Sequence, residues 1–303
     1  MNLNENSNFL VEVIADSYTK HGNRLTTMVV CFPRMILAEF NTHRMLSRNS
    51  ASSRAVPFNR MVHMVRENPF IPIAFQKDHR GMQGTEYFKD EELKERIDYW
   101  LACRDRAVLS AQTLSNHGVT KQICNRVLEP FMWHTVIVSA TDWQNFFSLR
   151  VHEAAEIHMQ QIAGMMLKVY NNSEPEFLDD GQWHLPFSDT IDEGRLGNML
   201  LENNNQGYTD EEMSSAIRDI CTARCARVSY LNFEGKDDYR ADINLCAMMR
   251  EQGHWSAFEH CAQAGGNMRM GNFKGFIQYR KMFQNENRTD SRVRRLTRHE
   301  NFE

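Results

Sequence analysis

The hydrophobic pattern of the chain begins with a strand and continues into helices. Residues 24–32 (RLTTMVVCF) form an apolar, β-rich run that Pro33 ends, and they predict a strand. Apolar residues at helical spacing predict a helix over 35–49, which enters a polar turn at 47–54. Residues 66–90 are rich in proline, glycine and charge, and we expect a surface loop there.

The elements that follow are predicted to be mostly long helices, because their apolar residues recur every three or four positions. These helices cover residues 93–116, 120–128, 142–170, 209–227 and 238–252. A short strand is predicted at 227–231, and we expect Glu259 and His260 to belong to a further strand. The stretch 171–210 is dominated by loop-forming residues and is the clearest boundary in the chain.

The composition is that of an ordinary globular protein. The 303 residues are 42% hydrophobic and 24% charged, which excludes wholesale disorder, and a net charge of −4 excludes a polybasic nucleic-acid coat. The sequence predicts neither a membrane-spanning helix nor a signal peptide. Seven scattered cysteines are typical of reduced thiols, so we expect a cytoplasmic protein.

Several familiar motifs do not occur. The chain lacks G-x-G-x-x-G, and Gly266 and Gly271 have P-loop spacing without the Lys-Ser/Thr that must follow. Cysteines and histidines within 221–261 do not match common zinc motifs, and no nucleophile elbow is present. A nucleic-acid-binding protein is a competing interpretation, based on an arginine-rich tail that acidic residues interrupt. The arginines of this tail are Arg288, Arg292, Arg294, Arg295 and Arg298.

Three segments, 42–54, 125–150 and 226–260, carry short motifs. Together they resemble motifs of the flavin-dependent thymidylate synthases (ThyX). Residues 42–54 (THRMLSRNSASSR) resemble the R-H-R-x7-S signature of that family. Residues 125–150 (NRVLEPFMWHTVIVSATDWQNFFSLR) resemble its R-x-x-L-P stretch and its later N-F-x-x-L-R. Residues 226–230 (ARVSY) and 253–260 (GHWSAFEH) resemble A-A-R-V-S and G-H-x-S-P-F-E-H. Each match is modest alone, and their joint occurrence favours the family.

The order of these segments differs from the usual one. In the family the third segment precedes the other two, whereas here it comes last. The sequence therefore resembles a circularly permuted member, with its break just after the FEH residues, which is physically reasonable where chain ends lie close together. This rearranged form is associated with phage genomes, which would place the protein in the cytoplasm of a bacterial host.

The resemblance implies an α+β fold, with a mixed β-sheet and long helices, as one catalytic domain over residues 1–303. Within it, 1–170 carries the T-H-R-x7-S signature and the pyrimidine-site helix, and 171–210 is a loop-rich connection. Residues 211–284 carry the ARVSY and GHWSAFEH motifs, and 285–303 form the basic tail. The resemblance also implies a homotetramer whose sites draw on several chains.

The implied reaction transfers a one-carbon unit from 5,10-methylenetetrahydrofolate to C5 of dUMP and gives dTMP. Reduced FAD supplies the hydride, and NADPH reduces the flavin again. None of the seven cysteines has the Pro-Cys-His setting of an ordinary thymidylate synthase nucleophile. Arg150 is expected instead to stabilise negative charge that develops on the pyrimidine.

The resemblance also assigns site residues position by position, with Arg150 as the catalytic residue and no metal. The expected substrate-binding residues, which supply guanidinium groups and hydroxyls for phosphate and base, are Glu39, Ser50, Ser52, Ser53, Arg54, Arg126 and Arg150. The expected FAD-binding residues are Thr42, His43, Arg44, Ser139, Asn145, Ser229, His254 and Ser256.

Four positions depart from the family pattern. Thr42 replaces the first arginine of the signature, Glu39 replaces a usual glutamine, and Ala257 replaces the proline of the FEH motif. Glu156 lies in a changed A-Q-x-E-I pattern. A carboxylate near the base would suit an amino group, so dCMP is an alternative substrate. A hydroxymethylated product and a non-catalytic nucleotide-binding relic are further alternatives.

Overall fold

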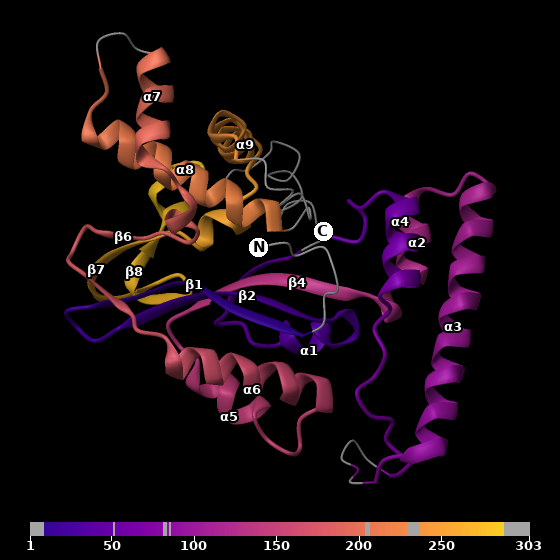
Figure 1. Ribbon diagram of the computed structural model, residues 1–303. Helices are drawn as coiled ribbons and strands as arrows, with labels where there is room; N and C mark the ends of the chain where they lie inside the picture. The colour runs from indigo at the N-terminus through magenta and orange to yellow at the C-terminus, as the bar shows by residue number, and fades with distance from the viewer. Residues whose placement is uncertain are drawn as a thin grey trace, which may run out of the picture.

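A computed structural model describes residues 9–50, 52–80, 84, 86–203, 207–228 and 237–287. It is an α+β protein with a five-stranded mixed sheet at its centre, in the order β3-β4-β2-β1-β5 (Figure 1). Strands β1 and β5 pair in parallel, and the other pairs are antiparallel. The bounds are Leu10–Thr19 (β1), Arg24–Pro33 (β2), Ser47–Ser50 (β3), Trp133–Ala140 (β4) and Glu176–Leu178 (β5). The fold class expected from the sequence is confirmed.

Helices and a small antiparallel sheet, β6-β7-β8, surround this central sheet. The helices are α1 (Leu37–Phe40), α2 (Phe58–Glu67), α3 (Asp90–Asn116), α4 (Lys121–Val127), α5 (Gln144–Arg150), α6 (Ile157–Asn172), α7 (Glu193–Asn203), α8 (Asp210–Val228) and α9 (Tyr239–Gln252). The small sheet comprises β6 (Trp183–His184), β7 (Ala262–Met270) and β8 (Phe273–Gln278). Single 3-10 turns are η1 (Arg34–Ile36), η2 (Glu129–Phe131), η3 (Ser188–Thr190), η4 (Ser256–Glu259) and η5 (Tyr279–Met282).

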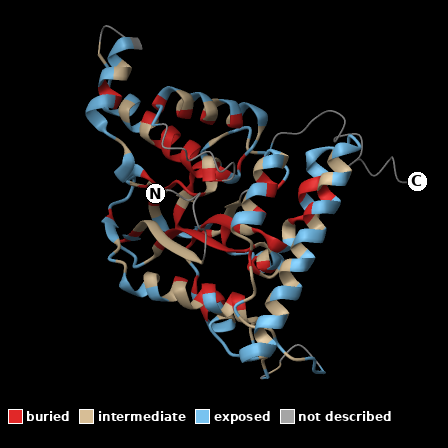
Figure 2. Cartoon of the chain, turned by 45° about the vertical axis from the view of Figure 1, so that its right-hand side comes forward, coloured by how far each residue is buried: buried red, intermediate tan, exposed pale blue. Residues whose placement is uncertain are grey.

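Both faces of the central sheet are covered, as Figures 1 and 2 show. On one face Val30 and Val138 pack against α5 and α6, where the aromatic Phe146 lies in the same apolar cluster. On the other face Val29 and Ile137 pack in a cluster with residues of α8, α9 and η4. Because successive side chains of a strand point to opposite faces, a strand covered on both sides is apolar at nearly every position. Strand β2 has this pattern over Met28–Phe32, and every position after Arg24 is buried.

Helices α2, α3 and α4 form an arm beside the sheet, with a small apolar cluster of their own (Figure 1). Helix α3 begins with three acidic residues, 90–92, which favour a helix N-terminus, and Gly118 with φ of +80° follows its end. Much of α3 is exposed (Figure 2). Its Cys103 is exposed, whereas the other six cysteines of the chain are buried.

Several predicted elements need correction. The helix predicted over 35–49 is only η1 and α1, because His43 turns the chain before β3 begins. The helix predicted over 142–170 is broken at 151–156, because the Glu156 side chain caps a new helix there. The loop-rich stretch 171–210 contains β5, β6 and α7. Glu259 lies in η4, with His260 at its C-cap, and neither belongs to a strand.

Some elements were missed or cannot be compared. Strands β1, β4, β7 and β8 were not predicted, although β4 is buried along most of its length and contains the apolar run Val136–Val138. The strand predicted at 227–231 is helical as far as Val228, and its remaining positions lie outside the described residues. In the described part of the chain, no helix is long and apolar enough to cross a membrane.

Candidate active site

Arg150 stands at the C-terminal end of α5. This short helix is anchored by Phe146 and Phe147, which are buried in the apolar cluster between α5, α6 and the sheet. Trp143, just before the helix, stacks on Phe147 with ring centroids 5.6 Å apart. The helix ends at Arg150 because the chain leaves helical geometry at Val151, with ψ of 52°. A rigid aromatic base therefore fixes the point from which the arginine extends.

The Arg150 guanidinium meets the signature segment of the chain. Its Nε donates to Nε2 of His43 at 2.8 Å, and its Nη2 donates to Oγ1 of Thr42 at 3.2 Å. Its Nη1 lies 3.8 Å from Oε2 of Glu39. Four residues predicted separately as catalytic, substrate-binding or FAD-binding are thus in direct contact, although more than 100 positions separate Arg150 from the other three.

His43 is held as a neutral imidazole. Burial, together with the positive charges of Arg150 and Arg48, lowers its pKa to about 4. Because Nε2 accepts the hydrogen bond from Arg150, the ring proton lies on Nδ1. The ring also contacts the edge of Phe146 at a centroid distance of 4.9 Å. His43 therefore orients Arg150 and adds no second positive charge beside it.

A pocket of about 730 Å³ opens beside Arg150. Glu39, Glu153 and Glu156 supply carboxylates to its lining, and Trp100 of α3 supplies an aromatic side. Phe75, Tyr87, Met35 and His158 also line it. This volume is in the usual range for small-molecule sites, and a mostly apolar wall with a few charged groups is typical of them.

Glu156 and His158 line the pocket at the start of α6. The Glu156 carboxylate accepts from the backbone N–H groups of His158 and Met159 at 2.8 and 3.0 Å. Its Oε1 lies 2.5 Å from Nδ1 of His158, whose Nε2 accepts from the backbone N–H of Ile73 at 3.0 Å. Burial acts to raise the pKa of Glu156, but these hydrogen bonds outweigh it and lower the pKa. His158 was missed by the sequence analysis; a glutamate two residues before it, at a helix start, was the available signal.

The carboxylate of Glu39 has fewer hydrogen-bonding partners than that of Glu156. Burial raises its pKa, and the negative charge of Glu156 raises it further, while Arg150 only partly opposes them. At 3.8 Å its contact with Arg150 is longer than a hydrogen bond. Glu39 therefore keeps capacity to accept hydrogen bonds from a ligand.

The residues expected to bind phosphate are not brought to this pocket within one chain. Ser50, Ser52, Ser53, Arg54 and Arg126 are not among the residues that line it. The Ser53 hydroxyl donates to Oε1 of Glu129 at 2.6 Å. Arg126, on α4, instead lines a separate pocket of about 500 Å³, together with Arg34 and Asn41.

The third segment of the resemblance packs beside the first. Turn η4 lies against β3, where the Ser256 hydroxyl donates to Oδ1 of Asn49 at 3.2 Å. The Nδ2 of Asn49 donates to the backbone oxygen of Cys225, at 3.0 Å. Exposed polar side chains beside these elements and on α5 are of the types that suit an anionic pyrophosphate and the polar rim of a flavin, so their chemistry fits FAD. The exposed donors are Arg44, Asn145, His254 and Ser256, while Ser229 lies outside the described residues.

Ser139 lies in a buried chain of hydrogen bonds that crosses the sheet. Its Oγ bonds to Nδ1 of His260 at 2.8 Å and to Oγ1 of Thr27 at 2.6 Å. Thr27 continues to Nε2 of His184 at 2.8 Å, and Nδ1 of His184 bonds to Ser17 at 2.9 Å. With an exposure of 0%, Ser139 has no open side in this chain, and its predicted role at FAD stays a prediction.

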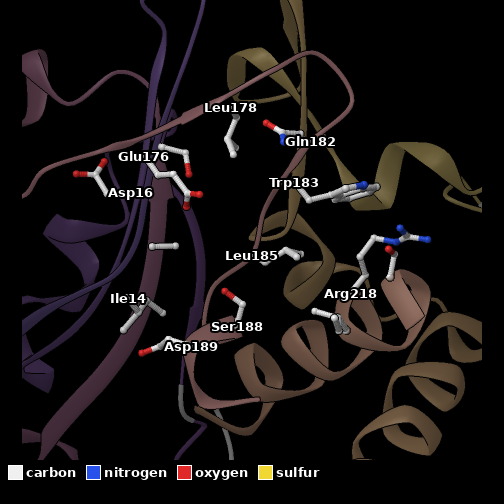
Figure 3. Close-up of a pocket in the computed structure, with 14 residues that line it drawn as sticks. Ile14, Asp16, Glu176, Leu178, Gln182, Trp183, Leu185, Ser188, Asp189 and Arg218 are labelled. Atoms are coloured by element: carbon white, nitrogen blue, oxygen red, sulfur yellow. The ribbon is translucent and has the colours of Figure 1, made fainter. Parts of the chain in front are cut away.

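Ser17, at the end of this series of hydrogen bonds, lines a second cavity of about 520 Å³. Figure 3 shows Asp16 and Glu176 on one side of this cavity and Trp183 and Arg218 on the other. The Arg218 guanidinium lies over the Trp183 ring, 4.9 Å from its centroid. The residues predicted to bind substrate or cofactor are not part of this lining.

We expect the buried histidines to make stability fall as the solution becomes acidic. Burial lowers the pKa of His184 and of His260 to about 3 each, from an ordinary value of 6.5. Between about pH 3 and pH 6.5, these two histidines bind protons in the unfolded chain but stay neutral in the folded chain. The free energy of unfolding is therefore highest above pH 6.5, and each histidine removes about 1.4 kcal/mol per pH unit below it.

Urea unfolding measured from pH 7 to pH 4.5 checks this slope. His184→Gln is expected to reduce the slope by about one proton, because it removes one of the titrating groups. A variant with the slope of the parent protein would contradict the assignment.

The fold and site together define an α+β protein with a charged, nucleotide-sized pocket next to the T-H-R signature. Residues 12–176, more than half of the chain, match the family described as thymidylate synthase complementing protein. The chain belongs to this family, as the sequence analysis predicted. The segments 226–230 and 253–260 lie outside the matched range, so the permuted order stays a prediction.

Two solved structures are also similar to the chain. One is a UMP/dUMP methylase, PolB from Streptomyces cacaoi, bound with 5-Br UMP; it has 16% identity and a TM-score of 0.47, over 55% of this chain and 90% of that chain. The same enzyme bound with 5-Br dUMP has 15% identity and a TM-score of 0.45, over 55% and 91%. A comparison with curated proteins finds no match.

Proposed function

We propose that this protein is a flavin-dependent methyltransferase acting at C5 of a pyrimidine deoxynucleotide, with 5,10-methylenetetrahydrofolate as the one-carbon donor. The family resemblance implies dUMP as substrate and dTMP as product. The observation that carries the proposal is the meeting of Arg150 with Thr42 and His43 at the mouth of a nucleotide-sized pocket. Family membership makes these the residues to consider first.

In this proposal Arg150 binds the pyrimidine ring and stabilises the negative charge that develops as C5 attacks the one-carbon unit. A fixed cation in a pocket shielded from water is most effective where charge develops, because no solvent has to reorganise. Neutral His43 holds the guanidinium in place through Nε2. Bound reduced FAD would supply the hydride, and the exposed donors Arg44, His254 and Ser256 would bind its polar parts.

A homotetramer accounts for the residues that stand away from the pocket. Ser52, Arg54 and Arg126 are suited to phosphate but do not line the pocket of Arg150 in one chain. A second copy would have to supply them, as the resemblance implies for sites shared between chains.

An absorption spectrum of the purified protein, before and after addition of FAD, is the first test. We expect flavin bands near about 450 nm that bleach when NADPH is added under nitrogen. The reduced protein is then mixed with methylenetetrahydrofolate and a pyrimidine deoxynucleotide, and the product mass is measured. A mass gain of a methyl group supports the proposal, and a hydroxymethyl gain identifies the alternative product. Absence of both flavin uptake and product would refute it.

A further inference from the structure

We infer that the pocket at Arg150 selects a pyrimidine that carries an exocyclic amino group, so that a cytosine nucleotide is preferred over a uracil nucleotide. This inference rests on the proposed function, because it concerns the base bound at the same arginine. The preference follows from the arrangement of the hydrogen-bond donors of Arg150 and the acceptor of Glu39 in the pocket.

One edge of the Arg150 guanidinium is already engaged by the protein. Nε and Nη2 share that edge, and they donate to His43 and Thr42. The adjoining edge, formed by Nη1 and the second hydrogen of Nη2, makes no contact at hydrogen-bond distance within the described residues. A guanidinium presents two parallel donors along such an edge, which a ligand with two neighbouring acceptors can fill.

Glu39 approaches this open edge at Nη1, the nitrogen that donates to neither His43 nor Thr42. Its Oε2 is 3.8 Å from Nη1, the nitrogen farthest from the contacts with His43 and Thr42. The site therefore offers one acceptor followed by two donors. A carboxylate accepts and cannot donate when it is ionised, so the position beside Nη1 requires a donor on the ligand.

This order matches cytosine. Along its Watson–Crick edge cytosine offers the N4 amino group as donor and then N3 and O2 as acceptors, which face Glu39, Nη1 and Nη2 in turn. Uracil offers O4, N3–H and O2, so O4 would face the carboxylate and N3–H would face an arginine donor. Uracil would thus set acceptor against acceptor and donor against donor at two partly buried side chains, and such mismatches weaken the binding of a close analogue.

The electrostatics of the pocket favour the same choice. Glu39 is partly buried near the second carboxylate Glu156, and Arg150 compensates it only from 3.8 Å. Glu156 is already satisfied by His158 and two backbone amides. An amino group on the ligand would supply the hydrogen bond that Glu39 lacks.

The test compares dCMP and dUMP binding to FAD-loaded protein by titration calorimetry, in the parent and in Glu39→Gln. The parent is expected to bind dCMP roughly 10- to 100-fold more tightly, the range of one hydrogen bond to a charged group. In Glu39→Gln the preference should fall to within about 3-fold, because an amide both donates and accepts. The flavin spectrum of the variant shows whether it is folded.

Glu153→Gln is the matched control. Glu153 lines the same pocket but makes no ion pair with Arg150 within the described residues, so its loss should leave the preference for dCMP unchanged. Tighter binding of dUMP, together with methyl transfer to it, would overturn this inference and leave the proposed function standing. If neither nucleotide binds the FAD-loaded protein, both fail. A preference that survives Glu39→Gln also contradicts the inference.

Discussion

Arg150→Ala is expected to lower turnover by about 1,000-fold or more while FAD remains bound, because the removed cation stabilises charge that exists only as the reaction proceeds. Among the expected FAD-binding residues Arg150 contacts Thr42 and His43. The exposed Arg44, His254 and Ser256 make no hydrogen bond with it within the described residues and remain available to the flavin. Single-turnover rates and the flavin spectrum, measured on the same preparation, separate loss of chemistry from loss of cofactor.

Arg106→Ala is the control for this prediction. Arg106 is also a helix arginine, but it lies on the exposed side of α3 away from the pocket lining. Its replacement should leave both turnover and the flavin spectrum unchanged. If Arg150→Ala turned over at the parent rate, the arginine would have no catalytic role.

Asp242→Ala is expected to lower the free energy of unfolding by roughly 3 kcal/mol, because Arg227 loses its buried carboxylate partner while Arg224 keeps the carboxylate of Asp237. The Asp242 side chain is only 3% exposed and accepts from Nε of Arg227 at 2.5 Å and from Nε of Arg224 at 3.5 Å. It thereby joins α9 to α8. Urea unfolding at pH 7 measures the loss.

The pair Arg104–Asp105, whose carboxylate is exposed, provides a comparison for the buried carboxylate of Asp242. Asp105 is 63% exposed and lies 2.9 Å from Nε of Arg104. Asp105→Ala should cost less than about 1 kcal/mol, because solvent already screens such a pair. Equal effects for Asp105 and Asp242 would show that burial does not make the Asp242 pair stronger.

The sequence predicted the elements whose signals are local. Strand β2 contains the apolar run Met28–Phe32, and α3, α4, α8 and α9 show helical spacing with clear start or stop residues. The break at 151–156 was missed, because the apolar spacing continues across it and only the capping role of Glu156 reveals the new helix. Strand β1 was missed because it is only half-buried and carries polar residues.

The candidate site could also be predicted only in part from the sequence. Family motifs supplied Arg150, His43 and Glu39, and the structure brings these three together. Their mutual geometry depends on how α5 packs on the sheet, which no local pattern encodes. The same motifs suggested that Arg126 belongs with Arg150, yet within one chain it lines another pocket. A sequence match assigns a role to a residue, but it does not say whether that residue acts in its own chain or in a neighbouring copy.

The exposure of Cys103 makes the protein convenient for fluorescence work. Since the other six cysteines are buried, a maleimide dye would attach to α3 at one place, without prior mutagenesis. Cys103 lies three residues after Trp100, on the same side of the helix, and Trp100 lines the pocket of Arg150. A fluorophore there would sit about one helical turn from a residue of the pocket lining. The native chain therefore already carries an attachment point for a reporter of ligand entry.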